Sequence, residues 1–89
     1  MKEQQIEELI LKVNKAFNVD LKQKSLKRLP FYLRCIILAK TKLHDTITAE
    51  IFQRDRATIH YYKQQYLYLK QYEDFQDLIK QVDKLWNTF

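Results

Sequence analysis

Glycine is absent from this chain of 89 residues, and proline occurs only once. The phosphate-cradling loops of nucleotide-binding proteins depend on glycine, and tight β-hairpin turns favour it strongly. The frequent Leu, Lys, Gln and Glu residues are good helix formers instead. Because a chain of this length has no room for a second hydrophobic core, we expect a single all-α domain spanning residues 1–89.

Apolar residues recur at helical spacing along most of the chain, which predicts a small bundle of about five helices. The first helix runs from about Glu3 to Phe17. Asn18 ends it, because Asn tolerates positive φ better than most residues. Pro30 lies in the first turn of a second helix that continues to about Lys42.

The second half of the chain contains three further helical segments. Asp45 or Thr46 caps a short third helix that ends at Phe52. A long fourth helix begins near Asp55, and a break at residues 72–74 precedes the last helix. The last helix carries apolar residues on one side: Phe75, Leu78, Ile79, Val82, Leu85 and Trp86.

The third and fourth helices together have the pattern of a helix-turn-helix. This unit needs a small residue midway along its first helix, a tight turn, and an apolar residue about six positions later. Ala49, Gln53 and Ile59 occupy these three places, although the turn residue is usually Gly. In such a unit the second helix lies in the DNA major groove, with its N-terminal residues facing the base edges. Residues 54–65 are therefore the candidate base-reading run.

Positive charge is concentrated in one part of the chain. Between residues 20 and 42, seven Lys or Arg accompany one Asp, whereas residues 71–89 contain two Lys and four acidic residues. A basic stripe beside a mildly acidic end is typical of a protein that binds phosphates. A solvated Lys-rich surface is the alternative interpretation.

The chain offers little from which a catalytic or metal site can be built. It has two His and one Cys, and Cys35 lies among apolar residues, which indicates a buried and inert thiol. No clustered carboxylate pair or metal-spaced ligand set occurs, so we expect no enzyme activity, no metal and no cofactor. No apolar run approaches the length of a membrane span, and no signal-peptide pattern opens the chain. We therefore expect a cytoplasmic, nucleoid-associated protein that does not contact membranes.

Several motifs follow one another in a distinctive order. Leu9, Val13 and Phe17 are spaced four residues apart in the first helix, the basic stretch Lys24–Arg28 comes next, and the run Arg54–Ile59 opens the fourth helix. Over the whole chain this order resembles the C-terminal DNA-binding domain of the bacterial replication initiator DnaA. That family has a first helix of the form Ile-x-x-x-Val-x-x-x-Phe and a later Arg-Asp-His-Thr-Thr-Val motif.

The resemblance implies DNA contacts outside the fourth helix. Arg34 matches an arginine that such domains insert into the minor groove. Lys24, Ser25, Lys27 and Arg28 match the basic loop that contacts the phosphate backbone.

The resemblance also implies that the start of the fourth helix reads the major groove. Asp55 and Arg56 match reader positions, and Thr58 matches the second Thr of the motif. Arg56 replaces His and Ala57 replaces the first Thr, so we expect the preferred bases to differ from those of the family. His60, Tyr61 and Lys63 lie on the outward side farther along this helix. The candidate DNA-binding residues of this run are Arg54, Asp55, Arg56, Ala57, Thr58, His60, Tyr61 and Lys63.

Each of these positions also has a structural interpretation. Arg56 either pairs with guanine O6 and N7 or lies in solvent. Asp55 either accepts from a cytosine amino group or caps the helix. Ala57 touches a thymine methyl or acts as a small spacer, and Thr58 contacts DNA or satisfies backbone groups of the first turn. Arg34 either reaches DNA or forms a salt bridge within the fold.

These features together predict sequence-specific binding of double-stranded DNA by a monomer. The chain has no ATPase domain, so we expect a regulator of replication initiation or transcription, or a protein of a phage or mobile element. A protein partner, such as a replication or transcription factor, is compatible with this role. The alternative is a helical protein–protein interaction module in which the same fold binds another protein.

Overall fold

The computed structural model describes residues 3–23, 27–42 and 44–87, and five α-helices lie within them. No strand occurs in this described part of the chain. The expected all-α bundle of about five helices is confirmed. The helices are α1 (Glu3–Phe17), α2 (Arg28–Lys40), α3 (Asp45–Phe52), α4 (Arg56–Leu69) and α5 (Glu73–Trp86).

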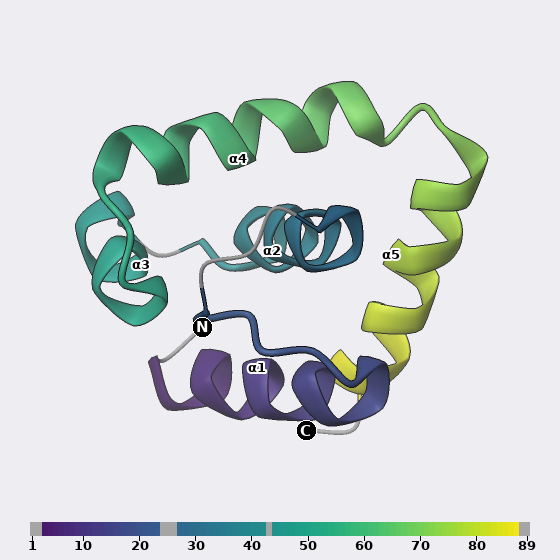
Figure 1. Cartoon of the computed structure of the whole chain (residues 1–89), viewed down its shortest axis with the longest axis horizontal. Helices are drawn as coiled ribbons and strands as arrows, with labels where there is room; N and C mark the ends of the chain where they lie inside the picture. Colours follow the sequence, from purple (N-terminus) through teal and green to yellow (C-terminus); the bar gives the residue numbers. More distant parts are fainter. Residues whose placement is uncertain (1–2, 24–26, 43, 88–89) are drawn as a thin grey trace.

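Helix α2 occupies the centre of the bundle, and the other four helices surround it (Figure 1). A helix enclosed in this way must be largely apolar around its whole circumference. Leu33 and the consecutive residues 35–38 meet this requirement, and all of them are fully buried. The central position of α2 also explains why its one internal arginine, Arg34, is buried with them.

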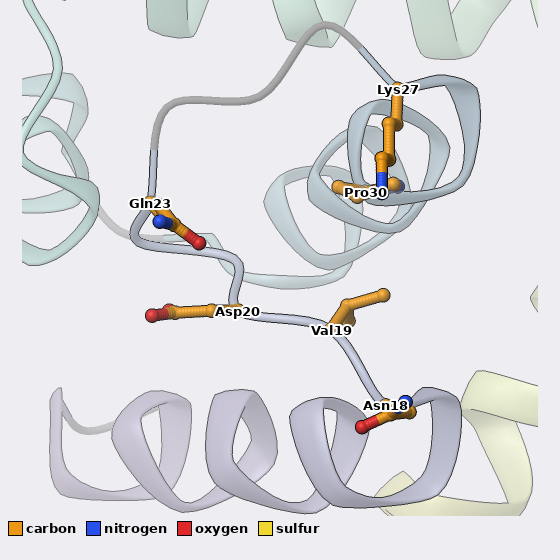
Figure 2. Close-up of a pocket in the computed structure, with 6 residues that line it drawn as sticks. All are labelled: Asn18, Val19, Asp20, Gln23, Lys27 and Pro30. Atoms are coloured by element: carbon orange, nitrogen blue, oxygen red, sulfur yellow. The ribbon is translucent and has the colours of Figure 1, made fainter.

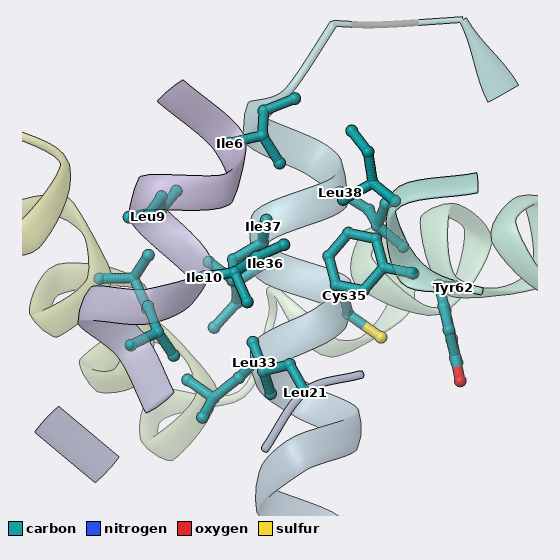
Figure 3. Packing of buried hydrophobic residues seen from close by; sticks show 14 of the residues in the cluster. Ile6, Leu9, Ile10, Leu21, Leu33, Cys35, Ile36, Ile37, Leu38 and Tyr62 are labelled. Atoms are coloured by element: carbon teal, nitrogen blue, oxygen red, sulfur yellow. The ribbon is translucent and has the colours of Figure 1, made fainter. Parts of the chain in front are cut away.

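The apolar face of α1 packs against α2 and forms a large part of the core. Ile6, Leu9 and Ile10 of α1 lie close to Ile36 and Ile37 of α2 (Figure 3). Complete burial of one such side chain contributes about 1.5–3 kcal/mol. These contacts belong to one continuous cluster of buried residues that also includes side chains of α3, α4 and α5.

Among the described residues, two have positive φ, and each of them follows the end of a helix. Asn18 (φ 54°) follows α1, as predicted, and Gln53 (φ 55°) follows α3. In this left-handed conformation the chain reverses direction, and backbone N–H groups after the helix donate hydrogen bonds to its last carbonyls. The left-handed conformation costs a residue with a Cβ roughly 1–2 kcal/mol, and Asn tolerates this conformation better than Gln.

The bounds of α2 differ from the prediction, which placed Pro30 in the first turn and the end at Lys42. The helix begins at Arg28, so Pro30 is its third residue and still lies in the first turn, where no N–H is required. It ends at Lys40, because Thr41 already has extended backbone (φ −82°, ψ 133°).

The cap of α3 also differs from the prediction. The helix is capped by His44, whose Nδ1 accepts a hydrogen bond from the Thr46 backbone N–H at 3.2 Å. Asp45, predicted as a cap together with Thr46, lies one residue inside the helix, and its carboxylate is engaged elsewhere. An imidazole nitrogen can act as the acceptor that a cap requires, although His is an uncommon cap.

Candidate nucleic-acid interface

The turn between α3 and α4 has the geometry of a helix-turn-helix. Gln53 takes the left-handed conformation, and the backbone N–H of Arg54 donates to the Ala49 carbonyl at 2.9 Å. Ala49 and Ile59 are buried, so α3 and α4 pack closely where the two helices meet. The three positions identified in the sequence therefore have the structural roles that the pattern assigns to them.

Asp55 caps the start of α4. Its Oδ1 accepts a hydrogen bond from the Thr58 backbone N–H at 2.7 Å. Hydrogen bonds from the Thr58 backbone and hydroxyl lower the pKa of this carboxylate. The structure thus shows Asp55 as the cap of α4. It also shows Thr58 satisfying a backbone hydrogen bond in the first turn of this helix. Asp55 is nevertheless exposed, and Thr58 is half-buried.

The outer surface at the start of α4 is open to solvent. Arg56, Ala57, His60 and Tyr61 are all exposed. No hydrogen bond or ion pair joins the side chain of Arg56 to another residue that the structure describes. Tyr61 is 50% exposed, and its ring lies 6.2 Å from that of Phe31 in α2. This surface offers one guanidinium, one methyl group, one imidazole and one phenol to a ligand.

Lys63 is one turn farther along α4 and has a partner within the fold. Its ammonium forms an ion pair with the Asp45 carboxylate at the start of α3, and both side chains are about one-third exposed. The hydrogen bond from Lys63 lowers the pKa of Asp45. Lys63 was predicted to line the groove, and in the structure its ion pair ties the two helices of the helix-turn-helix together.

The basic residues before α2 are only partly described. Lys24 and Ser25, both predicted to contact the DNA backbone, lie outside the described residues. Lys27 and Arg28 are exposed where α2 begins. Lys27 borders a polar cleft of about 390 Å³ between α2 and the segment that follows α1 (Figure 2). The other residues of the cleft are Asn18, Val19, Asp20, Gln23 and Pro30.

Arg34 does not lie where the prediction placed it. Its side chain is only 1% exposed, so it does not project toward a DNA minor groove. Its Nε donates to the Leu21 carbonyl at 2.7 Å, and its Nη2 donates to the Gln23 carbonyl. Burial lowers the pKa of the guanidinium, and the neighbouring Tyr62 opposes this effect. The alternative of a salt bridge is not observed among the described residues, because the acceptors are neutral carbonyls.

Arg54 opens the predicted DNA-reading run, but its side chain points back into the fold. Its Nη2 donates to the Gln23 carbonyl at 3.2 Å, so Gln23 accepts from two arginines. The role of Gln23 was not predicted, because every residue has a backbone carbonyl and the residue type does not indicate which carbonyl accepts from an arginine. This contact nevertheless brings the segment before α2 next to the helix-turn-helix turn.

Other classes of site have no counterpart in the described part of the chain. Its residues include no group of three or more His, Cys, Asp or Glu that could hold a metal ion. None of its helices has the length and apolar character required to cross a membrane. Cys35 is buried and not in a disulfide, and burial raises the pKa of its thiol to about 12.

Comparisons of the chain with protein-family models, with curated proteins and with solved structures gave no match.

Proposed function

We propose that this protein binds double-stranded DNA in a sequence-specific manner through its helix-turn-helix. The observation that carries the proposal is the exposed opening of α4, where Arg56 and Ala57 face solvent directly after a helix-turn-helix turn. This opening lies on the element that enters the major groove in other proteins with this motif. The resemblance to the DNA-binding domain of DnaA points in the same direction.

The chemistry of the exposed side chains suits base reading. The planar guanidinium of Arg56 can donate two hydrogen bonds to guanine O6 and N7, and Ala57 can touch a thymine methyl group. Asp55 holds its capping bond to Thr58 and still has a second carboxylate oxygen that can accept from a cytosine amino group. The small Ala57 leaves room for the helix to approach the base edges closely.

The electrostatics of the chain suit a polyanion. The formal net charge is +5, and Lys27 and Arg28 are exposed at the start of α2. The contact of Arg54 with the Gln23 carbonyl places the segment before α2 beside the turn that precedes α4. The basic side chains then contact phosphates while the opening of α4 faces the bases. In the cell, such a protein would regulate replication initiation or transcription.

Selection of bound duplexes from a random pool tests the proposal directly. We expect enrichment of one motif and an affinity that falls steeply with salt, because released counterions dominate binding to DNA. Arg56→Ala should relax the preference at one base pair by about 1–3 kcal/mol. Arg28→Ala should lower the affinity for all sequences alike. Failure to enrich any motif, with no salt-dependent binding, would refute the proposal.

Lys80→Ala provides a matched control for these variants. Lys80 is exposed on α5, which lies on the other side of the bundle from the start of α4 (Figure 1). The variant removes the same unit of charge as Arg28→Ala, so it corrects for the general effect of net charge. We expect a change in affinity smaller than about twofold, because α5 lies on the other side of the bundle from the proposed interface and salt screens exposed charges over such separations.

One observation favours the alternative of a protein-interaction module. Tyr61, Leu67, Tyr68 and Tyr72 are between 43% and 62% exposed along α4 and just beyond it. Tyrosine is enriched in protein interfaces, because it offers a large rigid surface with a polar end. Under this alternative, Tyr68→Ser would abolish binding to a protein partner while Arg56→Ala would leave it intact. Retention of DNA binding in Tyr68→Ser distinguishes the two functions.

A further inference from the structure

The carbonyl oxygen of Gln23 is held by two arginines from different parts of the fold. Arg54, in the turn between α3 and α4, donates through Nη2 at 3.2 Å. Arg34, in the centre of α2, donates through Nη2 to the same oxygen and through Nε to the Leu21 carbonyl at 2.7 Å. The segment from Leu21 to Gln23 is thereby fastened both to the core and to the helix-turn-helix turn.

Arg54 is also bonded to the turn on which it lies. Its Nη1 donates to the carbonyls of Phe52 and Gln53 at 3.4 and 3.3 Å. One guanidinium therefore joins the end of α3 to a residue 31 positions earlier in the chain. Only the fork of an arginine reaches three carbonyls in this way, because the ammonium of a lysine is a compact group on a flexible stem.

The fastened segment forms one side of the polar cleft. Asp20 and Gln23 lie on one side, in the segment after α1, and Pro30 of α2 lies opposite with Lys27, the residue before α2 (Figure 2). Leu21 is completely buried, so movement of this side would also disturb the core. The position of Gln23 relative to Lys27 therefore depends on the two arginines.

We propose that Arg54 is a positioning residue for DNA binding, which fixes the segment Leu21–Gln23 and with it the side of the cleft that faces the basic side chain Lys27 near the start of α4. This inference rests on the proposed DNA binding. Arg54 then acts through the Gln23 carbonyl and not as a reader of bases or a direct phosphate contact. Arg34 forms the other half of the same clamp, from within the core.

Amide hydrogen exchange tests the clamp without DNA. The N–H of Leu21 donates to the Asn14 side chain at 3.0 Å, and that of Lys22 donates to the Asp20 carboxylate at 3.1 Å. In Arg54→Ala we expect both amides to exchange at least about tenfold faster, because local opening of the segment becomes easier. The amides of α5 should keep their wild-type rates, which shows that the variant is folded. Unchanged exchange at Leu21 and Lys22 would overturn the clamp.

A double-mutant cycle with Lys27 tests the positioning role in DNA binding. Lys27→Ala should weaken affinity by about fivefold in the wild-type chain and by less than about twofold in Arg54→Ala, because coupled residues are not additive. Arg54→Lys keeps the charge but loses the fork, so we expect it to behave like Arg54→Ala in both experiments.

The outcomes separate the inference from the proposed function. Additive effects of Arg54→Ala and Lys27→Ala, or full affinity in Arg54→Lys, would identify Arg54 as a simple charge and overturn the positioning role. Absence of DNA binding by the wild-type chain would refute the proposed function and the role of Arg54 in it, whereas the exchange rates would still decide whether the clamp exists.

Discussion

Replacement of Arg34 by Met should destabilise the protein without removing a direct contact with DNA. The variant keeps a long unbranched side chain in the centre of α2 but removes both donors to the preceding segment. Arg34 is 1% exposed and bonds to the carbonyls of Leu21 and Gln23. A residue inserted into a minor groove would behave in the opposite way, with lower affinity and unchanged stability.

The size of the effect follows from these contacts. A hydrogen bond from a charged donor contributes about 1.5–3 kcal/mol, and two are lost. The Gln23 carbonyl keeps its bond from Arg54, whereas the Leu21 carbonyl loses its guanidinium donor. The absence of a buried charge in the variant offsets part of the loss. We expect a net decrease of about 3 kcal/mol in the free energy of unfolding, which lowers the Tm by about 12–24 °C in a domain of this size.

Urea unfolding monitored by circular dichroism and by the fluorescence of the single Trp86 measures this change. Arg28→Met is the matched control, because Arg28 lies on the same helix and is exposed, so its effect should stay within about 0.5 kcal/mol. An Arg34→Met variant as stable as Arg28→Met would refute the structural role of Arg34. If Arg34→Met had wild-type stability and a lower affinity for DNA, the result would support insertion of Arg34 into the minor groove.

Three further variants or probes test other features of the fold. Gln53→Gly should stabilise the protein by about 0.5–1 kcal/mol in urea unfolding, because φ is 55° at this position, whereas the control Gln64→Gly inside α4 should destabilise it by about 1 kcal/mol. Asp45→Asn should reduce stability at neutral pH by less than about 1 kcal/mol. Lys63 lowers the pKa of Asp45, so the stabilisation by this ion pair is present above the ordinary carboxylate pKa and disappears as pH falls through the lowered pKa. The urea unfolding curves of the wild type and of Asp45→Asn should therefore converge in acid. Alkylation of Cys35 at pH 8 should be at least roughly 100-fold slower in the native protein than in urea, since burial raises its pKa to about 12; equal rates would show an open core.

The parts of the fold that depend on short-range pattern could be predicted from the sequence. The spacing of Ile6, Leu9, Ile10 and Val13 predicts the buried face of α1, because residues three and four positions apart lie on the same side of a helix. The helix-turn-helix was predictable for the same reason. Its small, turn and apolar positions lie within eleven consecutive residues, and each has a local steric requirement.

The parts that depend on backbone acceptors far along the chain could not be predicted. Arg34 and Arg54 both donate to the backbone carbonyl of Gln23, and the sequence does not indicate which backbone carbonyls need a donor from a distant side chain. The cap by His44 could not be predicted either, because His is an uncommon cap and only the structure shows that its Nδ1 accepts from the Thr46 backbone N–H. Arg34 was therefore expected at the minor groove from the resemblance to the DnaA domain, whereas its surroundings place it in the core.

The net charge of the chain consequently overstates the charge available to DNA. Of the sixteen Lys and Arg residues, at least five are engaged within the fold. Two are the arginines of the Gln23 clamp, and three are lysines in ion pairs that join different helices or segments: Lys22 with Glu7, Lys40 with Asp83 and Lys63 with Asp45. Cations committed in this way release no counterions on binding, because their partners already neutralise or enclose them. Under the proposed DNA binding, the affinity comes from the small exposed set around Arg28 and Arg56, so its dependence on salt should correspond to a few phosphate contacts and not to the total of basic residues.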